Sequence, residues 1–304
     1  MALSRFSRTA PDRPCEWGEH DYRTWLRLDP EIDYPYLPVE WLAKIAKRGK
    51  YSKTRILDAA RHPHLFLRRR DYHFKSSVVS LSDKGIQRLI DEHHLADKPA
   101  RPRPQYAHEL GAAIAQASIE LGARKHGLEY FDWRTLRTHD NMPAKQATST
   151  DPFRFMLDDK HYHYFDRPPF VLQTPTETIA FFMEFDRFNE DLGGTARITI
   201  EKKLANIKTI WQRKLWQQMF DFDRAMLLWV STIDEDDAER PIKRQHAIMK
   251  RVEKVIGPCS YILFTSVHDF ERCIKSIKPH TDLVDNPWMR VGHRPFDLKE
   301  LREL

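Results

Sequence analysis

The chain has 304 residues, of which 41% are hydrophobic and 31% are charged, so it can bury a sizeable core, and at roughly 150 residues per domain it has room for two domains. Its longest apolar runs, such as residues 225–230, are far shorter than the roughly 18 to 20 residues that cross a bilayer, and residues 1–14 do not resemble a signal peptide. Three scattered cysteines, Cys15, Cys259 and Cys273, favour neither a zinc site nor a disulfide framework. We therefore expect a cytoplasmic globular protein without membrane contact.

The net charge of +6 is distributed unevenly along the chain. Between Lys44 and Lys75 there are eleven Lys and Arg residues and two acids, Asp58 and Asp71, so this segment carries +9 and the remaining residues together carry −3. Dense Lys and Arg on a small helical segment are typical of a nucleic-acid-binding surface. The alternatives are an ordinary solvated surface and a small helical domain that binds another protein.

Residues 36–97 are predicted to form a winged helix-turn-helix, preceded by an irregular arm over 1–35 that is rich in Pro, Arg and aromatic residues. Apolar residues recur at helical spacing over 39–46. A second short helix begins at Ser52 and ends before Pro63. Two short helices joined by a tight turn are the core of a helix-turn-helix domain.

A basic ribbon is expected after the second helix. Residues 65–81 are alternating or β-branched around a polar interruption at 75–77, and Ser82 can cap a further helix. In a winged helix the second helix enters the DNA major groove and the basic tip of the ribbon lies along the backbone. We expect mostly phosphate contacts, which position the protein without reading the sequence. The expected DNA-binding residues are Lys53, Arg55, Arg61, Arg68, Arg69, Arg70 and Lys75.

The Pro-rich stretch 98–105 is the predicted linker, because alternating Pro and Arg favour an extended conformation. Residues 106–304 alternate helices with apolar strands, which predicts an α/β domain with a central mixed sheet covered on both faces, and an α+β class for the whole chain. Helices are expected over 106–127, 195–220, 239–257 and from 267 onward, and strands over 128–133, 161–174, 177–188, 224–232 and 260–267.

Two carboxylates lie near the end of the apolar strand at 177–188. Strand alternation places Glu184 and Asp186 on the same face, roughly 6.5 to 7 Å apart, at a strand end of the kind where α/β sheets form sites. Clustered carboxylate oxygens suit a hard cation such as Mg²⁺, and the acidic pair 190–191 could join them. Lys203 on the next helix could stabilise a phosphate transition state.

A structural interpretation competes with the metal site. The two carboxylates could instead pair with Arg187, Arg197 or Lys203 in a buried ionic network that orients the helix on the sheet. His161 and His163 also share a predicted strand face. Because two histidines without a third ligand are more often packing or surface residues, their spacing favours those roles over metal ligation.

Four short motifs, in this order, resemble those of the plasmid replication-relaxation proteins found on bacterial plasmids and phages. They are VVSLSDKGIQRL at 78–89, AHELGAAIAQASIELGARKHGLEYFDW at 107–133, FFMEFDRFNEDL at 181–192 and KKLANI at 202–207. The third is similar to the family's apolar strand ending in Glu-x-Asp-Arg with an acid three residues later, here Glu184, Asp186, Arg187 and Glu190. The resemblance covers residues 38–270 and implies an N-terminal winged helix and a C-terminal restriction-endonuclease-like domain.

Two departures from the family pattern bear on cleavage. The family has Pro-Asp on the strand before the Glu strand, whereas this chain has Pro168 and Pro169, which leaves Asp166 as the nearby acid. An active nuclease of this type has Glu-x-Lys, and here Asp186 stands at the Lys position. Because a metal-dependent phosphodiesterase needs its first acid and its base, the resemblance implies a nuclease-like scaffold with reduced or absent cleavage activity.

We therefore expect a DNA-binding accessory protein of a plasmid or phage that acts in replication or relaxation. Its expected partners are duplex DNA and a protein of the replication or mobilisation complex, and the sequence leaves open whether it forms a homodimer. One alternative is a Mg²⁺-dependent endonuclease, with the carboxylate pair as metal ligands and a catalytic set made up of Asp166, Glu184, Asp186 and Lys203. Another is a regulatory protein whose exposed arm aromatics, Trp17 and Trp25, bind a partner.

Overall fold

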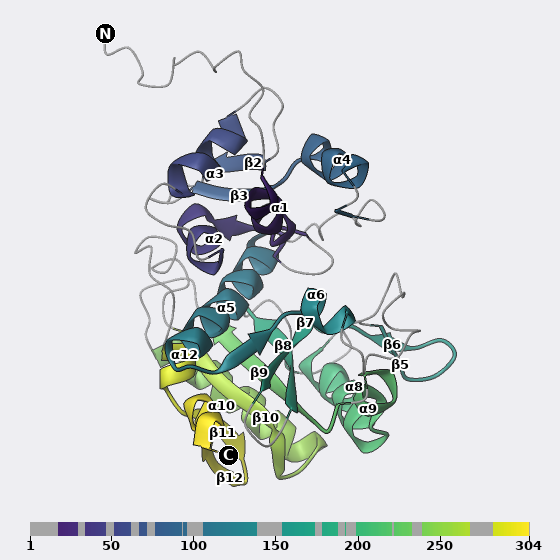
Figure 1. The fold of residues 1–304 in the computed structure, drawn as a ribbon. Helices are drawn as coiled ribbons and strands as arrows, with labels where there is room; N and C mark the ends of the chain where they lie inside the picture. The colour runs from purple at the N-terminus through teal and green to yellow at the C-terminus, as the bar shows by residue number, and fades with distance from the viewer. Residues whose placement is uncertain are drawn as a thin grey trace. The chain divides into compact units, whose positions relative to one another are not determined.

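The computed structural model of the chain separates into two compact units, Met1–Pro102 and Arg103–Leu304, shown as a ribbon in Figure 1. The boundary between the units falls inside the Pro-rich stretch 98–105. The residues that the structure describes are 18–29, 34–46, 52–61, 67–71, 77–92, 94–95, 106–138, 154–173, 178–187, 192, 199–220, 222–232, 239–267 and 282–303.

The N-terminal unit combines short helices with a small antiparallel sheet. The strand order is β1-β3-β2, so β3 is the central strand. Leu37 of β1 lies opposite Val79 of β3, and β2 pairs with β3 along its whole length. The elements in chain order are α1 (Glu19–Leu26), β1 (Leu37–Pro38), α2 (Val39–Ile45), α3 (Ser52–Arg61), β2 (Leu67–Asp71), β3 (Ser77–Leu81) and α4 (Asp83–Asp91).

Local sequence signals account for α2, α3 and α4. Pro38 stands at the N-cap of α2 with a φ of −61°, which suits entry into a helix. The Ser82 hydroxyl caps α4 by accepting a hydrogen bond from the Gly85 backbone N–H at 2.9 Å. Leu42 and Leu89 are fully buried, as their helical spacing predicts. The two short helices, the ribbon and the capped helix that the sequence predicts are therefore confirmed as elements.

The prediction of an irregular arm over 1–35 is wrong for Glu19–Leu26, which form α1. The helix is short and mostly polar, so its apolar face consists of little more than Tyr22 and Trp25, three residues apart. Trp25 is fully buried and cannot dock a partner. The other aromatic residue of the predicted docking arm, Trp17, lies outside the described residues.

The C-terminal unit is built on a seven-stranded sheet of order β12-β11-β10-β9-β8-β7-β4. Strands β8, β9 and β10 are parallel to one another, and the remaining pairs are antiparallel. This confirms the predicted α/β architecture with a central mixed sheet. The strands are β4 (Glu129–Phe131), β7 (Arg167–Gln173), β8 (Thr178–Asp186), β9 (Arg224–Thr232), β10 (Cys259–Val267), β11 (Trp288–Val291) and β12 (His293–Phe296).

Helices cover both faces of this sheet. Helix α8 connects β8 to β9, helix α10 connects β9 to β10, and the two helices contact each other. Helix α5 lies on the opposite face, because Phe185, which alternates with the carboxylates of β8, meets the His108 ring of α5 at a centroid distance of 5.7 Å. The helices are α5 (Tyr106–Lys125), α6 (Trp133–Arg137), α8 (Ile200–Gln212), α9 (Leu215–Phe220), α10 (Glu239–Val255), α12 (Asp282–Asp285) and the 3₁₀ helix η1 (Leu298–Glu303).

The core of the sheet explains why its central strands read as continuous apolar runs. In β8 every residue after Thr178 is buried, as expected for a strand covered on both faces. Phe182 of this strand lies in an aromatic cluster with Phe155, Phe165 and Phe220, whose ring centroids are 4.9 to 6.1 Å from that of Phe182. The Phe155–Phe182 pair is edge-to-face, an arrangement that adds to the stabilisation from area burial.

Three features of the C-terminal unit differ from the predicted elements. The helix expected over 195–220 is two helices, because Lys214 adopts a φ of 50° between α8 and α9. The strand expected over 161–174 is two strands, β7 and β6 (Tyr162–His163), and β6 forms a hairpin with β5 (Phe155–Met156). Strands β5, β11 and β12 were not predicted. The helix expected from 267 onward falls on 268–277, outside the described residues.

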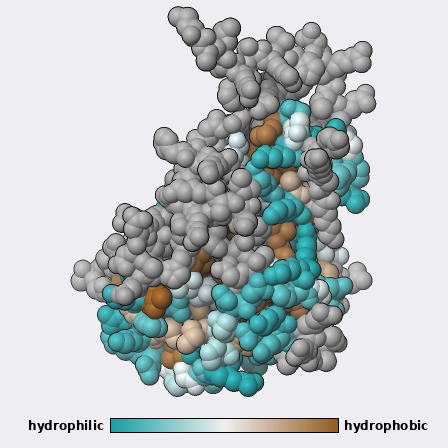
Figure 2. Space-filling view, turned by 90° about the vertical axis from the view of Figure 1, so that its left-hand side faces the viewer, coloured by the Kyte–Doolittle hydropathy of each residue, from teal (hydrophilic) through white to brown (hydrophobic). Residues whose placement is uncertain are grey.

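The described surface is largely polar. On the face shown in Figure 2 most coloured residues are hydrophilic, with apolar residues between them. None of the helices in the described part of the chain has the length and apolar character of a membrane-spanning segment. The exposed large hydrophobic residues, which lie on different elements, are Met156, Tyr162, Ile242 and Met289.

Candidate nucleic-acid interface and buried carboxylate cluster

The three consecutive arginines predicted to contact DNA lie on β2. Arg68 pairs with Ser80, Arg69 with Val79 and Arg70 with Val78 across the antiparallel ribbon. The structure therefore brings these three positions together on one strand of the ribbon. The side chains of Arg61, Arg68, Arg69 and Arg70, and the whole of Lys75, lie outside the described part of the chain.

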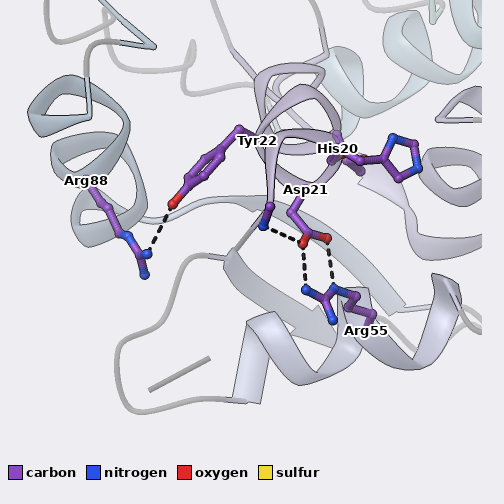
Figure 3. Close-up of polar contacts among 7 residues, drawn as sticks. His20, Asp21, Tyr22, Arg55 and Arg88 are labelled. Atoms are coloured by element: carbon purple, nitrogen blue, oxygen red, sulfur yellow. Dashed lines mark hydrogen bonds and ion pairs between the residues drawn. The ribbon is translucent and has the colours of Figure 1, made fainter. Parts of the chain in front are cut away.

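Lys53 and Arg55 on α3 are half-exposed and are engaged in ion pairs within the N-terminal unit. Lys53 Nζ pairs with the Glu40 carboxylate of α2. Arg55 binds Asp21 of α1 through two hydrogen bonds, from Nε to Oδ1 at 2.9 Å and from Nη2 to Oδ2 at 2.6 Å, as Figure 3 shows. Asp21 is buried, so the pair fixes α3 on α1, an intramolecular role that the sequence did not predict.

A second contact fixes α4 on the same helix. The Arg88 guanidinium donates to the Tyr22 hydroxyl at 3.1 Å (Figure 3) and to Glu92 at 2.6 Å. The Tyr22 ring stacks on His94 at a centroid distance of 4.3 Å. Burial, followed by the neighbouring Glu92 carboxylate, raises the pKa of Tyr22. Helix α1 thus holds both α3 and α4 in place.

In the C-terminal unit, two acids lie at the carboxyl end of β8 and a third lies just before β7. Four cationic or imidazole side chains surround these three acids. We call this group the carboxylate cluster. Glu184, almost fully buried, accepts a hydrogen bond from Lys203 Nζ of α8 at 2.7 Å. His163 Nε2 lies 3.3 Å from the other carboxylate oxygen of Glu184. The members of the cluster are Asp166, Glu184, Asp186, His108, His163, Lys203 and Arg244.

Asp186 is buried against Arg244 of α10. Arg244 donates from Nε to Oδ2 at 2.9 Å and from Nη2 to Oδ1 at 3.2 Å, a bidentate pair. The sequence predicted an arginine or lysine partner but not this one. Arg244 is one of many basic residues on α10 and lies 58 residues from its partner, so no local pattern distinguishes it.

Asp166 is held by a backbone amide and by His108 of α5. Its carboxylate accepts a hydrogen bond from the Phe185 N–H at 2.7 Å and lies 3.1 Å from His108 Nε2. Burial alone would raise the pKa of Asp166, but Lys203 and His108 outweigh it and hold that pKa well below its usual range. Burial likewise opposes protonation of His108, and the Asp166 carboxylate outweighs it and raises the pKa of His108.

Sequence reasoning assigned no role to His108, although it lies in the motif at 107–133 that carries part of the family resemblance. His161 and His163, which share a predicted strand face, have different surroundings. His161 is exposed and binds Asp158 through Nδ1 at 2.8 Å, whereas His163 is buried next to Glu184. The two histidines therefore have different partners, an exposed aspartate for His161 and a buried glutamate for His163.

The carboxylate cluster does not fit a Mg²⁺ site in this arrangement. No group of three His, Cys, Asp or Glu side chains within the described ranges could hold a metal ion. Lys203 is bonded to Oε2 of Glu184, and Arg244 is bonded to both carboxylate oxygens of Asp186, so these three oxygens are not open to a cation. The acidic pair at 190–191 lies outside those ranges. The arrangement is that of a buried ionic network joining α8 and α10 to the sheet.

Neither protein-family models nor curated proteins match this sequence, and no solved structure matches the chain.

Proposed function

We propose that the N-terminal unit is a winged helix that binds duplex DNA. The observation that carries this proposal is the order α1, β1, α2, α3, β2, β3 together with the sheet order β1-β3-β2. In a winged helix-turn-helix, α3 would be the helix that enters the major groove and the β2–β3 ribbon would be the wing. Three consecutive arginines, Arg68 to Arg70, lie on that ribbon.

The charge distribution supports the same surface. The segment from Lys44 to Lys75 includes α3 and β2 and carries +9, in a chain whose total is +6. Because Arg55 is held by Asp21 and Lys53 by Glu40, the arginines of the ribbon are the principal phosphate-binding residues in this proposal. Contacts to phosphates position a protein on DNA without reading base sequence, so we expect weak sequence preference.

The second unit then acts as a nuclease-like module that does not cleave. This part of the proposal is supported by the pairing of Glu184 with Lys203 and of Asp186 with Arg244, which leaves the carboxylates neutralised by protein cations. The resemblance to replication-relaxation proteins suggests the setting, namely a cytoplasmic accessory protein of a plasmid or phage. A partner protein of the replication machinery belongs to the same proposal.

The test is a salt series of duplex binding by the full chain, measured by fluorescence anisotropy. Changing Arg68, Arg69 and Arg70 to Ala should lower the slope of log K against log salt by about 2.7, at about 0.9 per lost phosphate contact. The matched control removes the same charge from three exposed lysines of the other unit, Lys160, Lys250 and Lys254.

An unchanged slope in the arginine variant would remove the proposal, as would an equal loss in the lysine control. The same preparations, incubated with supercoiled plasmid and Mg²⁺, should leave the plasmid uncut. Metal-dependent nicking by the parent chain that disappears in Glu184→Gln would show instead that the second unit is a working nuclease.

A further inference from the structure

Three arginines lie at the end of the sheet opposite the carboxylate cluster, on β9, β11 and β12. Arg224 begins β9, where it pairs with Ile179 near the start of β8. Ile262 of β10 pairs in parallel with Leu227 of β9. Counting back three residues on each strand places Cys259, the first residue of β10, beside Arg224. There Cys259 pairs with Val291 of β11, next to Arg290. We call Arg224, Arg290 and Arg294 the arginine cluster.

The Arg290 guanidinium is held by the hairpin that carries it. Its Nε donates to the Arg294 carbonyl oxygen at 2.8 Å, and its Cζ lies 5.3 Å from the centroid of the Phe296 ring, within the range of a cation–π contact. One hydrogen bond and one ring therefore fix its plane. The two terminal Nη groups have no recorded hydrogen bond to any residue that the structure describes.

Arg290 and Arg294 are not neutralised in the way that Arg244 is. No described carboxylate forms an ion pair with Arg290 or Arg294. Partial burial, followed by the positive charges of Arg294 and Arg224, lowers the pKa of Arg290. Like charges gathered in a partly desolvated position repel one another, and a bound anion would relieve that repulsion.

The turn that presents these side chains is sterically fixed. Gly292, between β11 and β12, has a φ of 72°, and a Cβ atom built on it would lie 2.7 Å from the Cβ of Pro258. Only glycine fits this close approach without displacing backbone. The turn therefore fixes the backbone positions of Arg290 and Arg294.

We propose that the arginine cluster binds a phosphate oxyanion. Guanidinium groups bind phosphate through paired N–H donors and are more weakly hydrated than ammonium groups, and the free Nη groups of Arg290 beside Arg294 provide such donors. The phosphate could belong to a nucleic-acid backbone or to a free phosphate compound. This site lies in the C-terminal unit and does not depend on the winged helix.

The experiment uses the full chain with Arg68, Arg69 and Arg70 changed to Ala, so that binding by the ribbon is removed, and adds Arg290→Gln with Arg294→Gln. The matched control adds Lys160→Gln with Lys250→Gln. In the first arm, affinity for a labelled duplex is measured across a salt series. In the second arm, the rise in Tm with added pyrophosphate is measured for each variant, since a ligand that binds the native state raises Tm.

If the site holds backbone phosphate, the arginine pair should weaken duplex binding several-fold and lower the salt slope by about 1.8, at about 0.9 per contact, while the lysine control leaves both unchanged. If it holds a free phosphate compound, the pyrophosphate-induced rise in Tm should disappear in the arginine pair only. Arg290→Lys with Arg294→Lys guards against a folding defect, because it keeps the charge and should keep most of the salt slope. The proposal is overturned if neither arm distinguishes the arginine pair from the lysine control.

Failure of the winged-helix proposal has a separate signature. In that case the change of Arg68, Arg69 and Arg70 alone would leave duplex binding unchanged, whatever the arginine cluster does.

Discussion

The two ends of the parallel strands in the C-terminal unit handle charge in opposite ways. At the carboxyl end of β8, Glu184 and Asp186 are buried and each is bonded to a cation. At the amino end of β9, Arg290 and Arg294 lie near Arg224. No described carboxylate is bonded to Arg290 or Arg294. Along β9, Arg224 is five residues from the residue that pairs with Glu184 and seven from the residue that pairs with Asp186. These separations are about 16 to 23 Å along the strand.

Under the phosphate-binding proposal, the difference separates charge that serves stability from charge that serves binding. A fully buried charge must be paired, because desolvation costs several kcal/mol per ion. A partly exposed arginine can remain unpaired, because water compensates it until a ligand arrives. We therefore expect variants at the carboxyl end to change unfolding and variants at the amino end to change binding.

The largest effect is expected at Glu184. Changing Lys203 to Met leaves the Glu184 carboxylate buried without its cation, and breaking such a pair costs about 3 to 5 kcal/mol. Urea unfolding monitored by circular dichroism measures this free energy. The double variant Glu184→Gln with Lys203→Met removes both charges of the pair and should recover part of the loss, because Asp166 still lacks the Lys203 charge. A loss below about 1 kcal/mol in Lys203→Met would place the pair among weak surface salt bridges.

A smaller, pH-dependent effect is expected at His108. Because its folded pKa is raised from 6.5, its stabilisation is present below about pH 6.5 and is lost as the pH rises through the folded value. The lowered pKa of Asp166 gives stabilisation above about pH 4 that is lost as the pH falls. The His108–Asp166 pair therefore stabilises the fold most between about pH 4 and about pH 6.5. Lys203 and Glu109 are the other charges that act on His108.

Changing His108 to Ala should cost about 1.5 to 3 kcal/mol in that window, the range for a hydrogen bond to a charged group, and less above it. Urea unfolding at a series of pH values measures the difference between variant and parent. His161→Ala is the control, since His161 is exposed and its acidic partner is also exposed. A pH-independent difference would exclude the His108–Asp166 pair as its source.

The smallest effect on unfolding is expected at the arginine cluster. Changing Arg290 and Arg294 together to Ala should alter the free energy of unfolding by no more than about 0.5 kcal/mol, as for surface substitutions away from a buried network. The same urea series measures it. A loss as large as that of Lys203→Met would mean that these arginines hold the fold together, and the contrast between the two ends would disappear.

Periodic segments of this molecule could be predicted from the sequence, and long-range partners could not. The apolar runs of β8 to β10 and the Ser82 cap of α4 are local signals, and both are confirmed. Strand β1 has only two residues and is defined by its pairing with β3, so nothing local marks it. Helix α1 was missed because its apolar face is so narrow.

In the candidate site, too, local patterns predicted some residues and did not predict the long-range partners. Alternation along β8 placed Glu184 and Asp186 together, and proximity in sequence suggested Lys203. Arg244 and His108 come from helices far along the chain, and only the folded sheet brings them to the acids. The metal interpretation came from the acids alone, and the structure adds the partners that bond them, Lys203 and Arg244.

The outermost strands of the C-terminal sheet also bear on how this protein behaves in concentrated solution. Strand β4 has three residues, and β12 has four, including Pro295, which lacks an N–H to donate. A short edge strand interrupted by proline is a poor template for a strand from another molecule. The sheet should therefore resist growing from one copy into the next, so that crowded preparations stay clear rather than forming fibres.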